Sequence, residues 1–97
     1  MNAKMEGYAT FFIKGRGMVL AGWITEGTAE PGMLVSIPSI PRKLEIIGIE
    51  QLNAPAGPSG TVGLLFPYGS DEEIALWKDL KVEGQIVNIE RSAESRP

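Results

Sequence analysis

Glycine and proline divide this sequence into short runs of apolar residues. The 97-residue chain contains 12 glycines and 7 prolines, and β-branched and aromatic residues are concentrated between them. Runs of this kind, bounded by turn-forming residues, are typical of β-strands. We expect six strands, at residues 8–14, 18–25, 33–37, 42–52, 61–66 and 82–89. These strands predict an all-β fold, a small closed antiparallel β-barrel.

The length of the chain bounds the number of domains. A protein of 97 residues has room for one hydrophobic core and buries only about 60–65% of the surface that its unfolded chain exposes. We expect residues 1–90 to form a single barrel domain and residues 91–97, RSAESRP, to form a disordered tail.

Two short stretches have the composition of tight turns. Gly15 and Gly17 flank Arg16, and both glycines can adopt the positive φ that a reversal of the chain requires. This predicts a hairpin that presents the Arg16 guanidinium at its tip. Pro31 followed by Gly32 fits a type II turn, which requires positive φ at its second central residue.

The run from residue 42 to residue 52, RKLEIIGIEQL, does not alternate cleanly between apolar and polar residues. A β-bulge near Gly48 would place Ile46 and Ile49 on the same face, although they are three residues apart. The stretch that follows, residues 53–60, is NAPAGPSG, and its composition predicts a loop.

The late part of the chain contains the pattern of one short helix, near residues 70–80. Ser70 is followed three residues later by Glu73, a capping box in which the Ser hydroxyl accepts from the Glu73 backbone N–H and the carboxylate reaches back. Ile74, Trp77 and Leu80 then form an apolar stripe. Acidic residues favour the first turn of a helix, so a helix start explains the acids at 71–73 better than a metal site does.

Composition excludes several classes of function. There is no cysteine and no histidine, so thiol nucleophiles, Cys or His metal ligands and the usual general base are missing. The sequence also lacks the phosphate-binding pattern G-x-x-x-x-G-K-[ST]. We therefore expect that the protein is not an enzyme and that it binds neither a cofactor nor a metal.

Charge and hydropathy bear on partners and location. The net charge of −3 argues against a general polyanion binder, and we expect no DNA binding. No segment has the roughly 20 apolar residues of a membrane span, and the first residues lack the apolar core of a signal peptide. We expect a soluble, cytoplasmic protein without a membrane partner.

The glycines, turns and strand registers together resemble the second domain of translational GTPases, the β-barrel of elongation factor Tu. The similarity covers about residues 7–90 and follows the order Gly15-Arg16-Gly17, Val19-Leu20, Gly22, Ile24, Gly27, Gly32, Val35-Ser36-Ile37, Gly48-Ile49-Glu50, Val62-Gly63-Leu64-Leu65, Glu72-Glu73-Ile74, Gly84-Gln85-Ile86. The GTPase phosphate loop is absent, so the resemblance implies the barrel alone, without the GTPase domain.

The resemblance also implies candidate binding residues. Ile13, Glu50 and Leu65 match the residue types that line the pocket for the terminal adenosine of a transfer RNA, and Arg16 matches the loop arginine. In the family this barrel contacts a tRNA end or ribosomal RNA. A purely structural alternative is that Arg16 pairs with Glu50 or closes the glycine loop, while Ile13 and Leu65 are ordinary barrel residues.

Strand alternation singles out a second surface. If Leu20, Gly22 and Ile24 point into the barrel, then the interface candidates Val19, Ala21 and Trp23 share its outer face. An apolar outer face needs a cover, which could be the helix at 70–80, a second copy of the chain or another protein. We therefore expect a non-catalytic binding module that uses this face for a protein partner or homo-oligomer. The alternative is a translation-linked RNA binder that uses Ile13, Arg16, Glu50 and Leu65.

Overall fold

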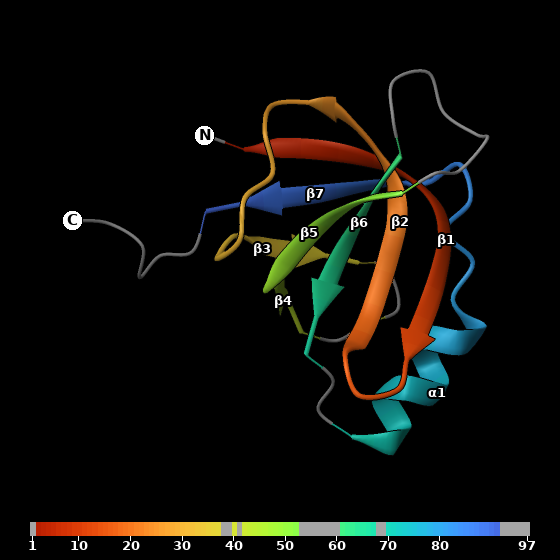
Figure 1. The fold of residues 1–97 in the computed structure, drawn as a ribbon. Helices are drawn as coiled ribbons and strands as arrows, with labels where there is room; N and C mark the ends of the chain where they lie inside the picture. The colour runs from red at the N-terminus through yellow and green to blue at the C-terminus, as the bar shows by residue number, and fades with distance from the viewer. Residues whose placement is uncertain (1, 38–39, 41, 53–60, 68–69, 92–97) are drawn as a thin grey trace.

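The computed structural model describes residues 2–37, 40, 42–52, 61–67 and 70–91. Within them the elements follow in the order β1 (Ala3–Ile13), β2 (Gly17–Glu26), β3 (Leu34–Ser36), β4 (Leu44–Glu45), β5 (Gly48–Leu52), β6 (Thr61–Phe66), α1 (Asp71–Asp79) and β7 (Ile86–Glu90). The strands form one sheet in the order β4-β3-β7-β1-β2-β6-β5 (Figure 1). Every pairing in it is antiparallel. The prediction of an antiparallel all-β fold with one short helix is confirmed.

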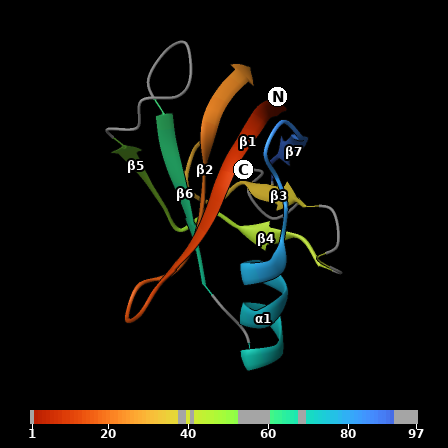
Figure 2. The same cartoon turned by 90° about the vertical axis from the view of Figure 1, so that its right-hand side faces the viewer.

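The sheet curls into a half-barrel. Figure 2 shows β5, β6 and β2 on one side and β7, β3 and β4 on the other, with β1 between them. The end strands β4 and β5 are joined by the chain itself, through Ile46 and Ile47. The closed barrel of about six strands is not confirmed, because the predicted strand 42–52 divides into two short strands that pair in different parts of the sheet.

The division of this strand occurs at a bulge. The Ile46 N–H donates to the Met33 carbonyl over 2.9 Å, whereas the Ile47 N–H donates to the Leu65 carbonyl over 2.8 Å. Gly48 is also paired with Leu65, so two residues face one, as in a β-bulge. Ile46 lies in the core and Ile49 packs against it, which confirms the predicted placement of these two side chains on one face.

Both predicted turns are present. Gly15 and Gly17 have φ of 85° and 135°, and they reverse the chain between β1 and β2. Gly32 has φ of 96°, and the N–H of Met33 donates to the carbonyl of Glu30 over 3.2 Å. The positive φ values explain why glycine stands at these positions.

The core lies on the inner face of the curled sheet. Its largest fully buried side chains are Trp77, Phe66, Met5, Met18, Leu20, Leu44, Ile46, Leu64 and Ile89. All but Ile46 and Trp77 belong to strands, and Trp77 is supplied by the helix. The helix therefore completes the core of the sheet.

Helix α1 begins where the sequence predicts. Ser70 is its N-cap, and the Glu73 N–H donates to the Ser70 hydroxyl over 3.1 Å. The Glu73 carboxylate is largely buried and receives two hydrogen bonds from the Arg42 guanidinium, from Nε over 2.8 Å and from Nη2 over 2.7 Å. The helix start is thus tied to the segment that precedes β4.

Two strands begin several residues away from their predicted starts. β1 begins at Ala3 rather than at residue 8, and Ala3 and Met5 are buried. β7 begins at Ile86 rather than at residue 82, because Gly84 has φ of 79° and the Gln85 N–H donates to the Val82 carbonyl, which forms a turn. The loop predicted at residues 53–60 and most of the tail at 91–97 lie outside the described residues. Within the part described, no helix is long and apolar enough to span a membrane.

Candidate functional site

The candidate site is the outer surface of β1, β2, β6 and β5, which we call the docking face. Met18 and Leu20 of β2 belong to the core, so Val19 and Ala21 point to the opposite side of the sheet. Val19 pairs with Phe11 of β1 and with Leu65 of β6. These pairings identify which residues of the neighbouring strands share the docking face.

A row of large apolar side chains crosses the docking face. Phe11, Val19 and Leu65 lie opposite one another on three adjacent strands, and Ile47 hydrogen-bonds to Leu65 at the bulge before β5. Adjacent strands are about 4.8 Å apart, so three spacings give the row a length of about 14 Å. Phe11 and Ile47, at its two ends, are 49% and 48% exposed. Exposed apolar side chains in such an arrangement are typical of a contact surface.

A row of small residues lies beside the large ones. Ala9, Ala21 and Gly63 are paired across β1, β2 and β6. Beyond them Trp23 contacts Tyr8, with their ring centroids 6.4 Å apart, and both side chains are half-buried. The docking face thus offers two aromatic rings in addition to the apolar row.

The residues suggested by the family resemblance come together on this face. Leu65 and Glu50 occupy it through their pairing with Val19 and Gly63, and Ile13, at the end of β1, is 38% exposed. The Arg16 guanidinium, in the β1–β2 turn, forms an ion pair with the Glu50 carboxylate of β5. The pair with Glu50 that the structural alternative for Arg16 expects is therefore present.

The three interface candidates differ in accessibility. Val19 and Ala21 are only 7% and 1% exposed, so they offer little surface to a partner. Trp23 is therefore the most accessible of the three interface candidates. Trp23 is half-buried, and it lies outside the core cluster.

Helix α1 does not provide the aromatic cover of Trp23. Its Trp77 is fully buried in the core, where the ring meets Phe66 edge-on at 5.8 Å. The Trp77 indole N–H donates to the carbonyl of Phe11 over 2.9 Å, and the Thr10 hydroxyl donates to the carbonyl of Trp77 over 3.1 Å. The helix is therefore anchored at the end of β1, and the ring that contacts Trp23 is that of Tyr8.

A pocket of about 390 Å³ adjoins the docking face at Tyr8. Its lining combines β1 with the segment around the end of α1, namely Tyr8, Ala9, Thr10, Lys78, Leu80, Lys81, Val82 and Glu83. Lys78 lies 5.8 Å from the centre of the Phe12 ring, a cation–π distance. Two lysines thus lie near the aromatic pair, with Glu83 as a nearby acid.

Sequence reasoning missed three residues of the docking face. Tyr8 and Phe11 were expected only as strand residues. The pairing of Phe11 with Val19 fixes the side of Phe11, whereas Tyr8 lies at a register shift between Gly7 and Ala9 and contacts Trp23. Ile47 was expected in the strand 42–52, and its exposure results from the bulge. The signal for Ile47 was the run Leu44, Ile46, Ile47, Ile49, which contains one more apolar residue than a single face can hold.

No group of His, Cys, Asp or Glu that could hold a metal ion is found among the described residues. Comparison of the chain with protein families, with curated proteins and with solved structures finds no match. The resemblance to the second domain of translational GTPases accordingly remains a prediction.

Proposed function

We propose that this protein is a non-catalytic binding module that docks on a protein partner through the docking face. The observation that supports this proposal is the row from Phe11 to Ile47, whose two ends are large, apolar and exposed. A solvated side chain of this type gains roughly 1.5–3 kcal/mol when it is fully buried. Burial of Phe11 and Ile47, with Ile13 beside them, therefore favours association with a partner.

The ion pair between Arg16 and Glu50 crosses the docking face, because Arg16 lies in the turn on one side of the apolar row and Glu50 pairs with Gly63 on the other side. Both side chains are about half exposed, so the pair contributes little to the stability of the monomer. Interfaces commonly combine apolar side chains with a few polar contacts. We infer that the ion pair orients the partner while Phe11 and Ile47 supply most of the affinity.

The test uses two variants with matched chemistry. Ile47→Asp places a charge on the docking face, and Ile86→Asp places the same charge on an equally exposed isoleucine of β7. Proteins captured from lysate of the source organism should be lost with Ile47→Asp and retained with Ile86→Asp. Sedimentation of the pure protein decides whether a second copy is the partner. A monomer whose captured proteins are the same for both variants would contradict the proposal.

The second candidate function is that of a translation-linked RNA binder. It is favoured by the gathering of Ile13, Arg16, Glu50 and Leu65 on one face, where an arginine and exposed apolar side chains could meet a phosphate and a base. Gel shifts with tRNA and ribosomal RNA fragments at low salt should then show binding. Arg16→Ala should weaken that binding and make its salt dependence shallower. Absence of any shift at low salt would remove this candidate.

A further inference from the structure

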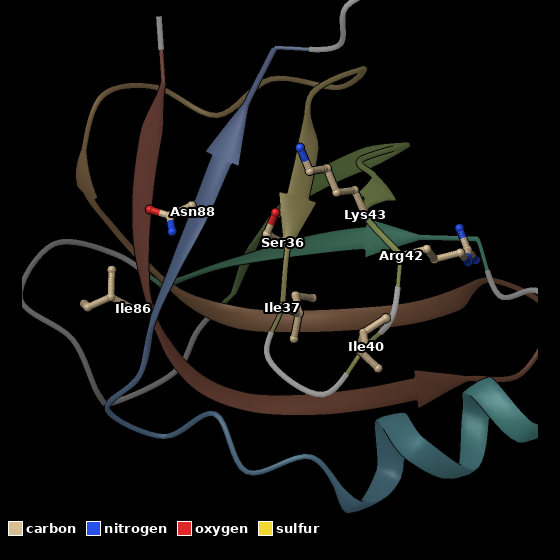
Figure 3. Close-up of a pocket in the computed structure, with 7 residues that line it drawn as sticks. All are labelled: Ser36, Ile37, Ile40, Arg42, Lys43, Ile86 and Asn88. Carbon is tan, nitrogen blue, oxygen red and sulfur yellow. The ribbon is translucent and has the colours of Figure 1, made fainter.

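A second pocket lies on a different part of the sheet, over β3 and β7. It has a volume of about 440 Å³ and is lined by Ser36, Ile37, Ile40, Arg42, Lys43, Ile86 and Asn88 (Figure 3). This volume is in the range of pockets that hold small molecules. None of the docking-face residues belongs to it, so any ligand here is independent of the proposed protein partner.

Three segments that are distant in sequence build the pocket. Ser36 of β3 and Asn88 of β7 are direct partners in the sheet, and both point outward because Val35 and Val87 belong to the core. Figure 3 shows Ile86 and Asn88 on one side of the pocket, Ile40 and Arg42 on the other, and Ser36 with Ile37 between them. The antiparallel pairing of β3 with β7 therefore fixes the spacing of the polar groups.

Among the described residues, the lining is basic and contains no acid. Arg42 and Lys43 contribute positive charge, and the acids that pair with them, Glu73 and Glu90, are not part of the lining. Lys43 Nζ is 2.5 Å from Glu90 Oε1 in a half-exposed pair, which leaves two of its three N–H donors for another partner. A ligand with a negative group therefore meets two cations, each already paired with a carboxylate outside the lining.

Arg42 is held in place before any ligand binds. Two of its five N–H donors are used by the Glu73 carboxylate, in a paired geometry that fixes the plane of the guanidinium. Its side chain is 48% exposed, whereas that of Glu73 is 11% exposed. The largely buried acid thus fixes the guanidinium of a residue that lines the pocket.

Neutral donors and apolar surface complete the lining. The Ser36 hydroxyl and the Asn88 amide form no side-chain hydrogen bond with the rest of the described chain, and both can donate. Ile37 and Ile40 are nearly buried and Ile86 is 49% exposed, so one part of the pocket is apolar. Convergent polar groups beside an apolar wall are the usual features of a small-molecule site.

We propose that this pocket binds a small amphipathic carboxylate. The carboxylate accepts hydrogen bonds from Lys43, Ser36 and Asn88, with Arg42 at the rim, and the aliphatic part of the ligand packs on Ile37, Ile40 and Ile86. Both halves of the ligand are necessary, because the half-exposed cations alone attract an ion weakly. A short aliphatic acid has few atoms, so its affinity is expected in the millimolar range.

The experiment titrates the full-length protein with hexanoate while backbone amide shifts are recorded by NMR. Saturable shifts are expected at Ser36, Lys43, Ile86 and Asn88. Hexanol, which lacks the charge, and inorganic phosphate, which lacks the apolar part, should bind more weakly by about tenfold or more. Equal binding of either probe, or no saturable shift with hexanoate, would overturn the proposal.

Two variants test the two halves of the site. Lys43→Met removes the charge and keeps the aliphatic stem, and Ile86→Asp adds a repelling charge at the apolar wall. Each should weaken hexanoate binding by about tenfold, whereas Ile47→Asp on the docking face should leave it unchanged. A loss with Ile47→Asp equal to that with Ile86→Asp would mean that hexanoate responds to net charge alone, and the pocket would not be its site.

Discussion

Replacement of Trp77 by alanine tests whether helix α1 is an integral part of the core. The side chain is fully buried, contacts Phe66 edge-on and donates its indole N–H to the Phe11 carbonyl. Truncation of a buried Trp to Ala costs about 3–5 kcal/mol. This is a large part of the 5–15 kcal/mol that typically stabilises a folded domain. For a domain of this size the midpoint of thermal unfolding should fall by about 12–40 °C.

A second variant at the same position separates packing from hydrogen bonding. Trp77→Phe keeps an aromatic ring that can still face Phe66, but it leaves the Phe11 carbonyl without its indole donor. The cost of an unsatisfied buried group is about 1–3 kcal/mol. We therefore expect Trp77→Phe to have a free energy of unfolding between those of the wild type and Trp77→Ala.

Urea unfolding followed by far-ultraviolet circular dichroism measures these free energies without depending on the fluorescence of the replaced residue. Leu76→Ala is the matched control, since Leu76 precedes Trp77 in the same helix and is 45% exposed. Its effect should stay below about 1 kcal/mol. If Trp77→Ala costs no more than Leu76→Ala, the helix is not anchored through the core and the reasoning is wrong.

Two further predictions concern the backbone. A methyl group at Gly22 would lie 2.2 Å from the Glu6 carbonyl oxygen, whereas at Gly48 its nearest neighbour would be 3.6 Å away. Gly22→Ala should therefore destabilise by more than about 2 kcal/mol through strain in the sheet, and Gly48→Ala by less than about 1 kcal/mol. Equal urea midpoints would refute the close contact. Ser70→Ala removes the N-cap acceptor of α1 and should cost about 1 kcal/mol in the same assay, and an unchanged midpoint would show that the cap contributes nothing.

Local features of the fold could be predicted because each depends on a few neighbouring residues. The cap at Ser70 follows from a hydroxyl three residues before an acid, and the positive φ of Gly32 follows from its place after Pro31. The bulge before β5 was indicated by the run from Leu44 to Ile49, which contains one more apolar residue than a single face can hold. These features require no knowledge of which strands are neighbours.

The ends of β1 and β7 were harder to predict. Ala3 and Met5 alternate with Lys4 and Glu6, which is the two-residue period of a strand. These residue types do not favour strands, so the alternation alone was a weak signal. Val82 is apolar, which favoured an early strand start. The turn that ends at Gln85 was indicated only by Gly84.

Closure of the barrel could not be predicted because it depends on long-range geometry. The run 42–52 has the length of one strand, yet Ile46 pairs toward β3 and Ile47 pairs toward β6. Whether such a bent segment completes a ladder or only links two edges depends on the curl of the whole sheet. The sequence pattern contains no information on how strongly the sheet curls.

The two proposed surfaces arise from the fold in different ways, and this makes their tests independent. The docking face follows from alternation on adjacent strands. The outward residues of β2, together with the strand register, identify the residues of the neighbouring strands that share this face. The pocket exists only because β3 pairs with β7, which places Ser36 beside Asn88, and no local pattern predicts that pairing. Ile47 and Ile86 are equally exposed and lie on different surfaces. Aspartate at either position should therefore damage one function and preserve the other, and a loss of both functions with one substitution would show that the two surfaces are coupled.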